Sequence, residues 1–177
     1  MEQSKWKSRL EVVTNVAVLL VAVTVLSALV WTYFQRSPKL QMQSGFQKGQ
    51  SLPQLPTVSY GNSPQTLLIA MSTTCHYCSE SLPFYKQLIK AQQQQSGRAT
   101  HIVAVFPNSE GEVKQYVQRN QLNVDNVTDV NFKALNVSGT PAMLLVDKNG
   151  KVVDFWFGKL SSDDEQQVIK AVSEPKT

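Results

Sequence analysis

The chain has 177 residues, of which 42% are hydrophobic and 17% are charged, a composition typical of a globular protein. Lysine and arginine exceed aspartate and glutamate by four, but residues 1–39 carry +3 of this net charge and residues 40–177 only +1. The positive charge therefore flanks an apolar N-terminal segment and does not form the basic patch typical of nucleic-acid-binding domains.

The chain contains two cysteines, Cys75 and Cys78. They are too few for a disulfide scaffold in a domain of this size, and too few for a closed four-ligand zinc site within one chain. His76 could add a third ligand, but the adjacent residues Cys75 and His76 would rarely both bind one metal ion. His101 opens an apolar run and has the pattern of a residue at the edge of a strand. We therefore expect no metal site.

Residues 12–35 contain no charged residue and are dominated by valine, leucine and alanine. At 1.5 Å per residue, a helix of this length crosses a hydrocarbon layer of about 30 Å. Trp31, Tyr33 and Phe34 cluster near its C-terminal end, as aromatic residues do at a membrane interface. The pattern predicts a single-pass transmembrane anchor over residues 12–35.

A cleaved signal peptide and a buried core helix are the competing interpretations of this segment. The apolar stretch is longer than a typical signal-peptide core, and bulky residues stand where a small-x-small cleavage site would lie. An all-round apolar helix would also be hard to bury in a domain this small. The positive charges on the two sides of the segment are nearly balanced, so they do not decide its orientation in the membrane. The cysteine pair favours placing the domain outside the cytoplasm. We expect residues 1–11 in the cytoplasm and the domain outside it, in the periplasm, a lumen or the cell exterior.

Residues 36–56 are rich in glutamine, serine, glycine and proline and predict a linker, within which residues 49–56 are candidates for a first irregular strand. A domain over residues 57–177 follows. Apolar periodicity and caps predict strands over 65–71, 101–106, 124–130, 142–146 and 151–157, and helices over 77–95, after Ser109, over 132–135 and after Ser161. Pro83 predicts a kink in the first helix, and Asn149-Gly150 predicts a hairpin turn.

This order of elements predicts an α/β fold with a central mixed sheet. The parallel strands come first and an antiparallel pair ends the sheet, which we expect to be covered by helices on both faces.

The sequence Cys75-His76-Tyr77-Cys78 lies where the first buried strand gives way to the first helix. At a helix N-terminus, free backbone N–H groups and the helix dipole favour a thiolate, the form that attacks disulfides. Cys75 is therefore the candidate nucleophile, with a pKa well below that of free cysteine, and Cys78, one turn inward, is the candidate resolving thiol. A cationic His76 would favour the thiolate and make the couple more oxidising. The alternative is a structural disulfide or a chance match.

A second motif, Gly139-Thr140-Pro141, precedes the predicted hairpin, where a proline is by itself an ordinary strand-start residue. With this motif the chain resembles the thioredoxin superfamily, and most closely the membrane-anchored TlpA-, ResA- and redoxin-type thiol–disulfide oxidoreductases. The resemblance covers about residues 49–172. It rests on Cys75 and Cys78 after a buried strand, on Pro83, and on residues 137–141 and 145–150.

The resemblance implies a thioredoxin-like fold in which the bond to Pro141 is cis and lies beside the dithiol, while the backbone at Thr140 pairs with an extended substrate chain. Tyr77, Thr140 and Pro141 are thus the expected substrate-binding residues. It also implies protein thiol or disulfide substrates, an upstream redox partner and no cofactor besides the Cys75–Cys78 disulfide, and we expect a monomer. A reductant that keeps partner cysteines available as thiols, as in cytochrome c maturation, fits this branch, whereas His76 favours an oxidant.

Three positions depart from the family's pattern. Thr74 replaces a frequent tryptophan before the first cysteine, and Ile69 replaces a buried acid or asparagine. Ser81 replaces a functional glutamate found in some members, with Glu80 one step away. The usual proton acceptor for Cys78 is therefore not identified from the sequence.

Two other functions remain open. A peroxiredoxin would carry proline and threonine where this chain has Leu68 and Ser72, so its activating loop is missing. The other is a non-catalytic binding module, either a metal chaperone or a thioredoxin-like scaffold that holds a partner in the groove around Pro141.

Overall fold

The computed structural model describes residues 15–16, 18–28, 45–94 and 100–174. The chain divides into two compact units, residues 1–41 and 42–177. In the first unit the described residues are helical, and their large apolar side chains, from Val16 to Leu26, are exposed.

The predicted cytoplasmic residues 1–11 lie outside the described residues, as do positions 12–14, 17 and 29–35 of the predicted anchor. The first nine residues of the predicted linker, 36–44, also lie outside them. No helix within the described part of the chain has both the length and the apolar character needed to cross a membrane.

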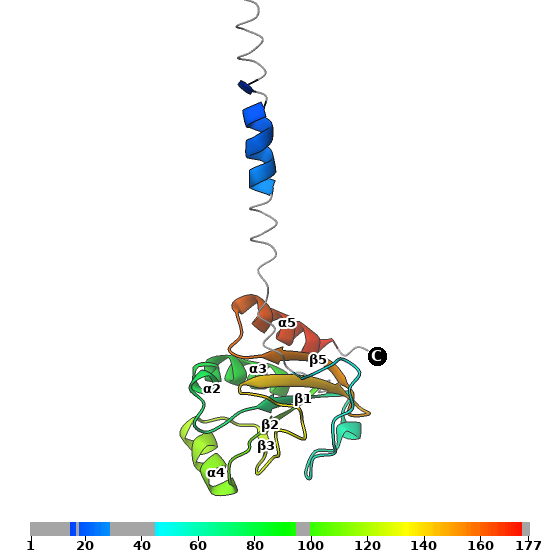
Figure 1. Cartoon of the computed structure of the whole chain (residues 1–177). Coiled ribbons are helices and arrows are strands. Elements are labelled where there is room, and N and C mark those ends of the chain that lie inside the picture. Colours follow the sequence, from blue (N-terminus) through cyan, green and yellow to red (C-terminus); the bar gives the residue numbers. More distant parts are fainter. Residues whose placement is uncertain (1–14, 17, 29–44, 95–99, 175–177) are drawn as a thin grey trace, which may run out of the picture. The chain divides into compact units, whose positions relative to one another are not determined.

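A five-stranded mixed sheet forms the centre of the second unit. Its strands are β1 (Gln65–Ala70), β2 (Thr100–Val105), β3 (Asp125–Val127), β4 (Ala142–Asp147) and β5 (Val152–Phe157), in the order β3-β2-β1-β4-β5 (Figure 1). β2 runs parallel to β1 and β3, while β4 is antiparallel to β1 and β5. The predicted mixed sheet, with parallel strands first and an antiparallel hairpin last, is confirmed.

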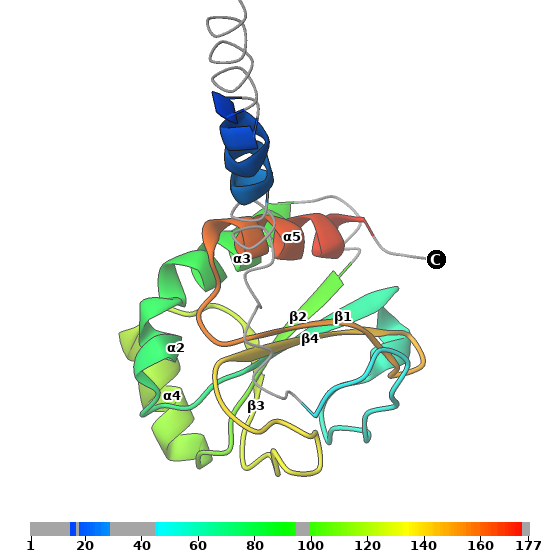
Figure 2. The ribbon, with the colours of Figure 1, turned by 45° about the horizontal axis from the view of Figure 1, so that its top comes forward.

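The two faces of the sheet are covered in different ways. The α-helices of the domain are α2 (His76–Glu80), α3 (Leu82–Gln94), α4 (Glu110–Arg119) and α5 (Ser162–Ser173). All four bury side chains in one cluster with Leu67 and Ile69 of β1. Figure 2 shows α3 and α5 lying side by side. Because side chains alternate along a strand, Leu68 and Ala70 face the other way.

This other face is covered by irregular chain and by the 3₁₀ helix η1 (Tyr60–Asn62), which contributes Tyr60. Phe46, Leu52 and Leu55 pack here together with residues from 127–137. Among the described residues the α-helices pack on one face only, so the expectation of α-helices on both faces is wrong. The apolar residues of these covering segments are spaced too irregularly to form the stripe of an amphipathic helix.

The predicted linker is too long at its C-terminal end. Phe46, Leu52 and Leu55 are at most 8% exposed. The N–H of Gly49 donates to Val152 O at 2.7 Å, and the N–H of Leu52 donates to the carbonyl of Gly150 at 2.9 Å. The segment from Phe46 onward thus belongs to the domain, because burial of its few apolar residues fixes it to the hairpin.

The helix predicted over residues 77–95 is two helices, α2 and α3, separated at Ser81. Pro83 has no N–H and cannot donate to the carbonyl four residues earlier, so the first helix ends where a kink was expected. The short helix predicted over residues 132–135 is a turn, in which the N–H of Leu135 donates to the carbonyl of Phe132 at 3.2 Å. The chain leaves it through Asn136 at φ +56°, a left-handed conformation that ends helical geometry.

The predicted caps and hairpin are confirmed. Ser109 and Glu112 form a reciprocal capping box at the start of α4, and Ser161 Oγ accepts the N–H of Asp164 at 3.3 Å at the start of α5. In the hairpin, Gly150 adopts φ +75°, which favours glycine.

Candidate active site

Cys75 and Cys78 are joined by a disulfide just after β1, with their Cα atoms 5.2 Å apart. Cys75 is the N-cap residue of α2, with extended backbone angles, and its Sγ accepts the N–H of Cys78 at 3.1 Å. The sulfur therefore lies where free N–H groups and the helix dipole favour negative charge, as the sequence predicted.

The two sulfurs differ in their access to solvent. Cys75 is partly exposed, whereas Cys78 is 0% exposed and belongs to the helix-covered core. A sulfur of another protein would therefore meet Cys75 first.

The Thr140–Pro141 peptide bond is cis, as the resemblance implied. Pro141 is buried and Thr140 is partly exposed. The carbonyl oxygen of Thr140 lies 3.4 Å from Cys75 Sγ, a position at which the reduced thiol can donate a hydrogen bond. The structure thus brings Thr140 and Pro141, 65 or more residues along the chain, next to the Cys75 sulfur, the candidate nucleophile.

Asn108 was missed from the sequence. Its Oδ1 accepts the N–H of Thr73 at 3.1 Å, which ties the loop before Cys75 to the segment between β2 and α4. The N–H of Cys75 also donates to the carbonyl of Ser72 at 3.1 Å. An asparagine in a loop carries no spacing signal, so only the fold reveals this contact.

The exposed side of α2 carries a cluster of charged groups. His76 is 78% exposed, and its Nε2 lies 2.9 Å from Glu80 Oε1. The other carboxylate oxygen accepts from Lys159 Nζ at 2.7 Å. The hydrogen bond from Lys159 is the main reason that the pKa of Glu80 lies below its ordinary value. Tyr77, which follows His76 in the chain, is 58% exposed.

The interior behind Cys78 lacks the acid that the family often has there. Ile69 is buried in the helix-covered core, and Ser81 Oγ donates to the carbonyl of Tyr77 at 2.8 Å. The buried polar side chains among the described residues are Gln65, Thr66, Ser81, Gln92 and Thr100, which include no carboxylate. Burial raises the pKa of Tyr85, which hydrogen-bonds to Ser81, so this phenol stays protonated at neutral pH.

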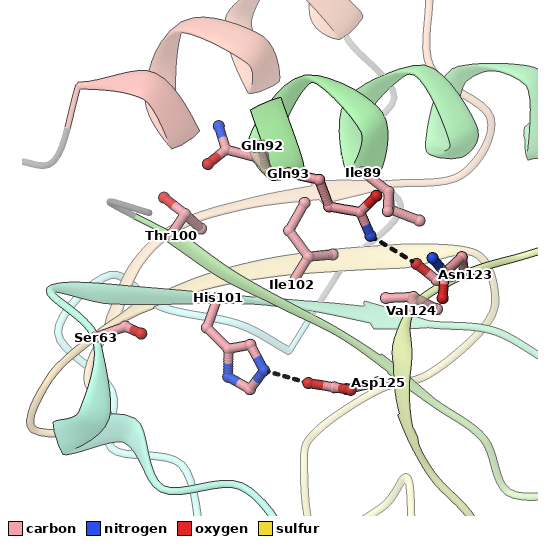
Figure 3. A pocket seen from close by; sticks show the side chains of 10 residues that line it. All are labelled: Ser63, Ile89, Gln92, Gln93, Thr100, His101, Ile102, Asn123, Val124 and Asp125. Atoms are coloured by element: carbon pink, nitrogen blue, oxygen red, sulfur yellow. Dashed lines mark hydrogen bonds and ion pairs between the residues drawn. The ribbon is translucent and has the colours of Figure 1, made fainter. Parts of the chain in front are cut away.

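A separate cavity of about 250 Å³ lies at the opposite end of the parallel strands (Figure 3). Thr100 and His101 at the start of β2 line it, and His101 Nε2 lies 2.8 Å from Asp125 Oδ2. Since Thr100 pairs with the first residue of β1, and the disulfide follows the last, this cavity does not belong to the cysteine site. The described part of the chain holds no group of three or more His, Cys, Asp or Glu residues suited to a metal ion.

Comparison with known proteins agrees with this arrangement. Residues 52–173 match the family model of the thioredoxin-like domain, which covers more than half of the chain. The chain belongs to the thioredoxin-like family. This membership, together with the Cys75–Cys78 disulfide, confirms the predicted family and the predicted enzyme class, a thioredoxin-like thiol–disulfide oxidoreductase.

Solved structures share the fold at low sequence identity. A thiol:disulfide interchange protein from Bacteroides sp. has 20% identity and a TM-score of 0.59, with 74% of this chain and 93% of that chain covered. StoA from Bacillus subtilis has 18% identity and a TM-score of 0.53, with 63% and 84% covered. A secreted disulfide oxidoreductase from Mycobacterium tuberculosis, described as homologous to DsbE of E. coli, has 18% identity and a TM-score of 0.50, with 62% and 81% covered. No curated protein sequence matches this chain.

Proposed function

We propose that this protein is a membrane-anchored thiol–disulfide oxidoreductase that exchanges disulfides with protein substrates outside the cytoplasm. The observation that carries the exchange chemistry is the asymmetry of the two sulfurs. Cys75 is partly exposed at the start of α2, and Cys78 lies fully buried behind it.

Each sulfur has one role in the proposed exchange. In the reducing direction, the Cys75 thiolate attacks a substrate disulfide, forms a mixed disulfide and releases one substrate thiolate. Cys78 then loses its proton and attacks the Cys75 sulfur, which closes the Cys75–Cys78 disulfide and releases the second substrate thiolate. Two electrons pass from the dithiol to the substrate, and the oxidising direction is the reverse of these steps.

The surface around Cys75 suits an extended protein segment. The backbone at Thr140 is the proposed pairing partner for the substrate chain, next to the sulfur that it must reach. Pro141 restricts the backbone conformation next to Thr140, and the exposed Tyr77, two residues after Cys75, offers an apolar contact. An added strand of this kind gains main-chain hydrogen bonds without requiring one particular substrate sequence.

The proposed location rests on sequence features. Residues 12–35 are uncharged and long enough to cross a bilayer, and the branch that the sequence resembles acts outside the cytoplasm. The disulfide oxidoreductase from Mycobacterium tuberculosis that shares this fold is described as secreted. Carbonate extraction of membranes that contain the full chain tests the anchor. Protease digestion of intact and opened cells tests the side on which the domain lies.

The direction of electron flow depends on the potential of the dithiol. Reduction of partner disulfides to thiols, such as the thiols that receive haem in cytochrome c maturation, is the direction that we propose from the resemblance. Equilibration of the full chain with glutathione buffers measures it. A Cys75–Cys78 potential of about −270 mV, the value for thioredoxin, supports the reductant. A potential of about −120 mV overturns the reductant in favour of an oxidant.

Trapping of a mixed disulfide tests the exchange itself. Reduced full chain carrying Cys78→Ser, mixed with insulin as a disulfide substrate, should accumulate a covalent complex through Cys75, because the resolving thiol is missing. The matched control, Cys75→Ser, leaves one buried thiol and should trap little. Equal trapping by both variants, or none by either, would contradict the proposed roles.

A further inference from the structure

The charged groups beside the attacking sulfur pair with one another. Glu80 Oε1 lies 2.9 Å from His76 Nε2, one helical turn away. Cys75 caps the N-terminus of α2, and Glu80 is the last residue of that helix. At 1.5 Å of rise per residue, the five steps from Cys75 to Glu80 span about 7.5 Å. The pairing therefore draws the imidazole along α2, away from the end at which Cys75 Sγ lies.

A second cation keeps the Glu80 carboxylate in place. Lys159 Nζ lies 2.7 Å from Glu80 Oε2, so each carboxylate oxygen has its own partner. Lys159 follows Gly158, whose N–H donates to the carbonyl of Pro141 at 2.8 Å. The chain next to Lys159 is thus hydrogen-bonded to Pro141, beside the disulfide.

His76 pairs with Glu80 and makes a T-shaped ring contact with Tyr77, with the two ring centroids 5.7 Å apart. Within the described residues, no hydrogen bond or ion pair joins the imidazole to either sulfur. The pKa of Glu80 lies below its ordinary value, mainly because of the hydrogen bond from Lys159, so the carboxylate is ionised at neutral pH. The titratable or charged groups that face His76 are therefore Tyr77 and Glu80 of α2, with Lys159 behind Glu80.

We infer that Glu80 is a positioning residue, which holds the imidazole of His76 away from Cys75 and so limits how strongly His76 stabilises the Cys75 thiolate. This inference rests on the proposed role of Cys75 as the attacking sulfur. The inference also alters the sequence-based prediction that a cationic His76 favours the Cys75 thiolate. While Glu80 is present, the positive charge of a protonated imidazole is balanced by a carboxylate, and His76 has little effect on the thiolate.

A double-mutant cycle in the reduced full chain tests the inference. The four proteins are the wild type, Glu80→Gln, His76→Gln and the double variant. The measurement is the pH dependence of iodoacetamide alkylation at Cys75, read by mass spectrometry of the peptide that contains it. The side chains of His76 and Glu80 are 78% and 36% exposed, so these changes should be tolerated, and circular dichroism checks that each variant folds.

The expected result is a coupling between the two positions. Glu80→Gln should lower the pKa of Cys75 by about 0.5–1 unit, the size of one charge pair at an exposed site. His76→Gln alone should change it by less than about 0.2 unit, and in the Glu80→Gln background it should reverse most of the decrease. Glu174→Gln, which removes a carboxylate at the end of α5, is the matched control and should leave the pKa of Cys75 unchanged.

Two results would overturn the inference. One is a decrease of the same size in Glu80→Gln whether or not His76 is present, because the loss of the negative charge alone then accounts for it. The other is no change in Glu80→Gln. The alkylation readout needs no turnover, so failure of the proposed function would show separately, as absence of insulin trapping by Cys78→Ser while the coupling persists.

Discussion

Thr100→Val is expected to destabilise the domain strongly, because it breaks a buried polar cluster that joins β1, β2 and α5. Thr100 is 2% exposed, and its hydroxyl donates to the carbonyl of Val172 at 2.6 Å. The same hydroxyl accepts from Gln65 Nε2 at 2.7 Å, and that amide also donates to the carbonyl of Ala171 at 2.8 Å. Valine has nearly the shape of threonine but can neither donate nor accept, so the change isolates the hydroxyl.

The expected loss follows from the groups that are left behind. One N–H of Gln65 loses its acceptor, and the carbonyl of Val172 loses this donor. A buried polar group that is left unsatisfied costs about 1–3 kcal/mol. We therefore expect the free energy of unfolding to fall by about 3 kcal/mol, a large share of the roughly 5–15 kcal/mol typical of a domain. With a urea m-value of about 2 kcal/mol per molar, the midpoint should fall by about 1.5 M.

Urea unfolding of the oxidised full chain, followed by tryptophan fluorescence in mild non-ionic detergent, measures this loss. Thr100→Ser is the matched control, since it keeps the hydroxyl and removes one methyl group, worth about 0.8 kcal/mol. If Thr100→Ser destabilised the protein as much as Thr100→Val, packing of the methyl group and not the hydrogen bonds would hold these elements together.

Three further predictions concern local structure, and urea unfolding checks each of them. Gly150→Ala should cost about 2 kcal/mol, because Gly150 has φ +75° and an added Cβ would lie 2.9 Å from Tyr60 Cδ2; an unchanged midpoint would contradict this. Ser161→Ala should cost about 1 kcal/mol by removing the cap of α5, and Ser161→Asp should restore it. Hydrogen bonds from Ser109 hold the pKa of Glu112 below its ordinary value, so its stabilising effect is present above the unfolded pKa and is lost as the pH falls through the folded one. The stability difference between the wild type and Glu112→Gln should therefore shrink as the pH falls below the unfolded pKa and close below the folded pKa, and a difference that stays constant through acid pH would refute this.

Local sequence patterns predicted much of the fold. The strand before Cys75 is a short apolar run between turn residues, and the hairpin is specified by Asn149-Gly150, so short-range chemistry decides both. The caps at Ser109 and Ser161 depend on residues only three positions away. The cysteine pair was found for the same reason, since its placement at a strand-to-helix junction is local.

Features that depend on distant contacts were not predicted. Glu80 and Lys159 are 79 positions apart, and only the return of the chain after β5 brings them together. The segment from Phe46 was assigned to the linker because its composition is polar, although three apolar side chains suffice to attach it to the sheet. The cis bond at Pro141 was expected only through the resemblance, because a proline before a strand does not by itself specify it.

The reactivity of Cys75 tests the central claim most directly. Reduced full chain should be alkylated by iodoacetamide at Cys75 before Cys78, with a midpoint well below the value of about 8.5 for free cysteine. A midpoint equal to that of free cysteine, or faster alkylation of Cys78, would contradict the account.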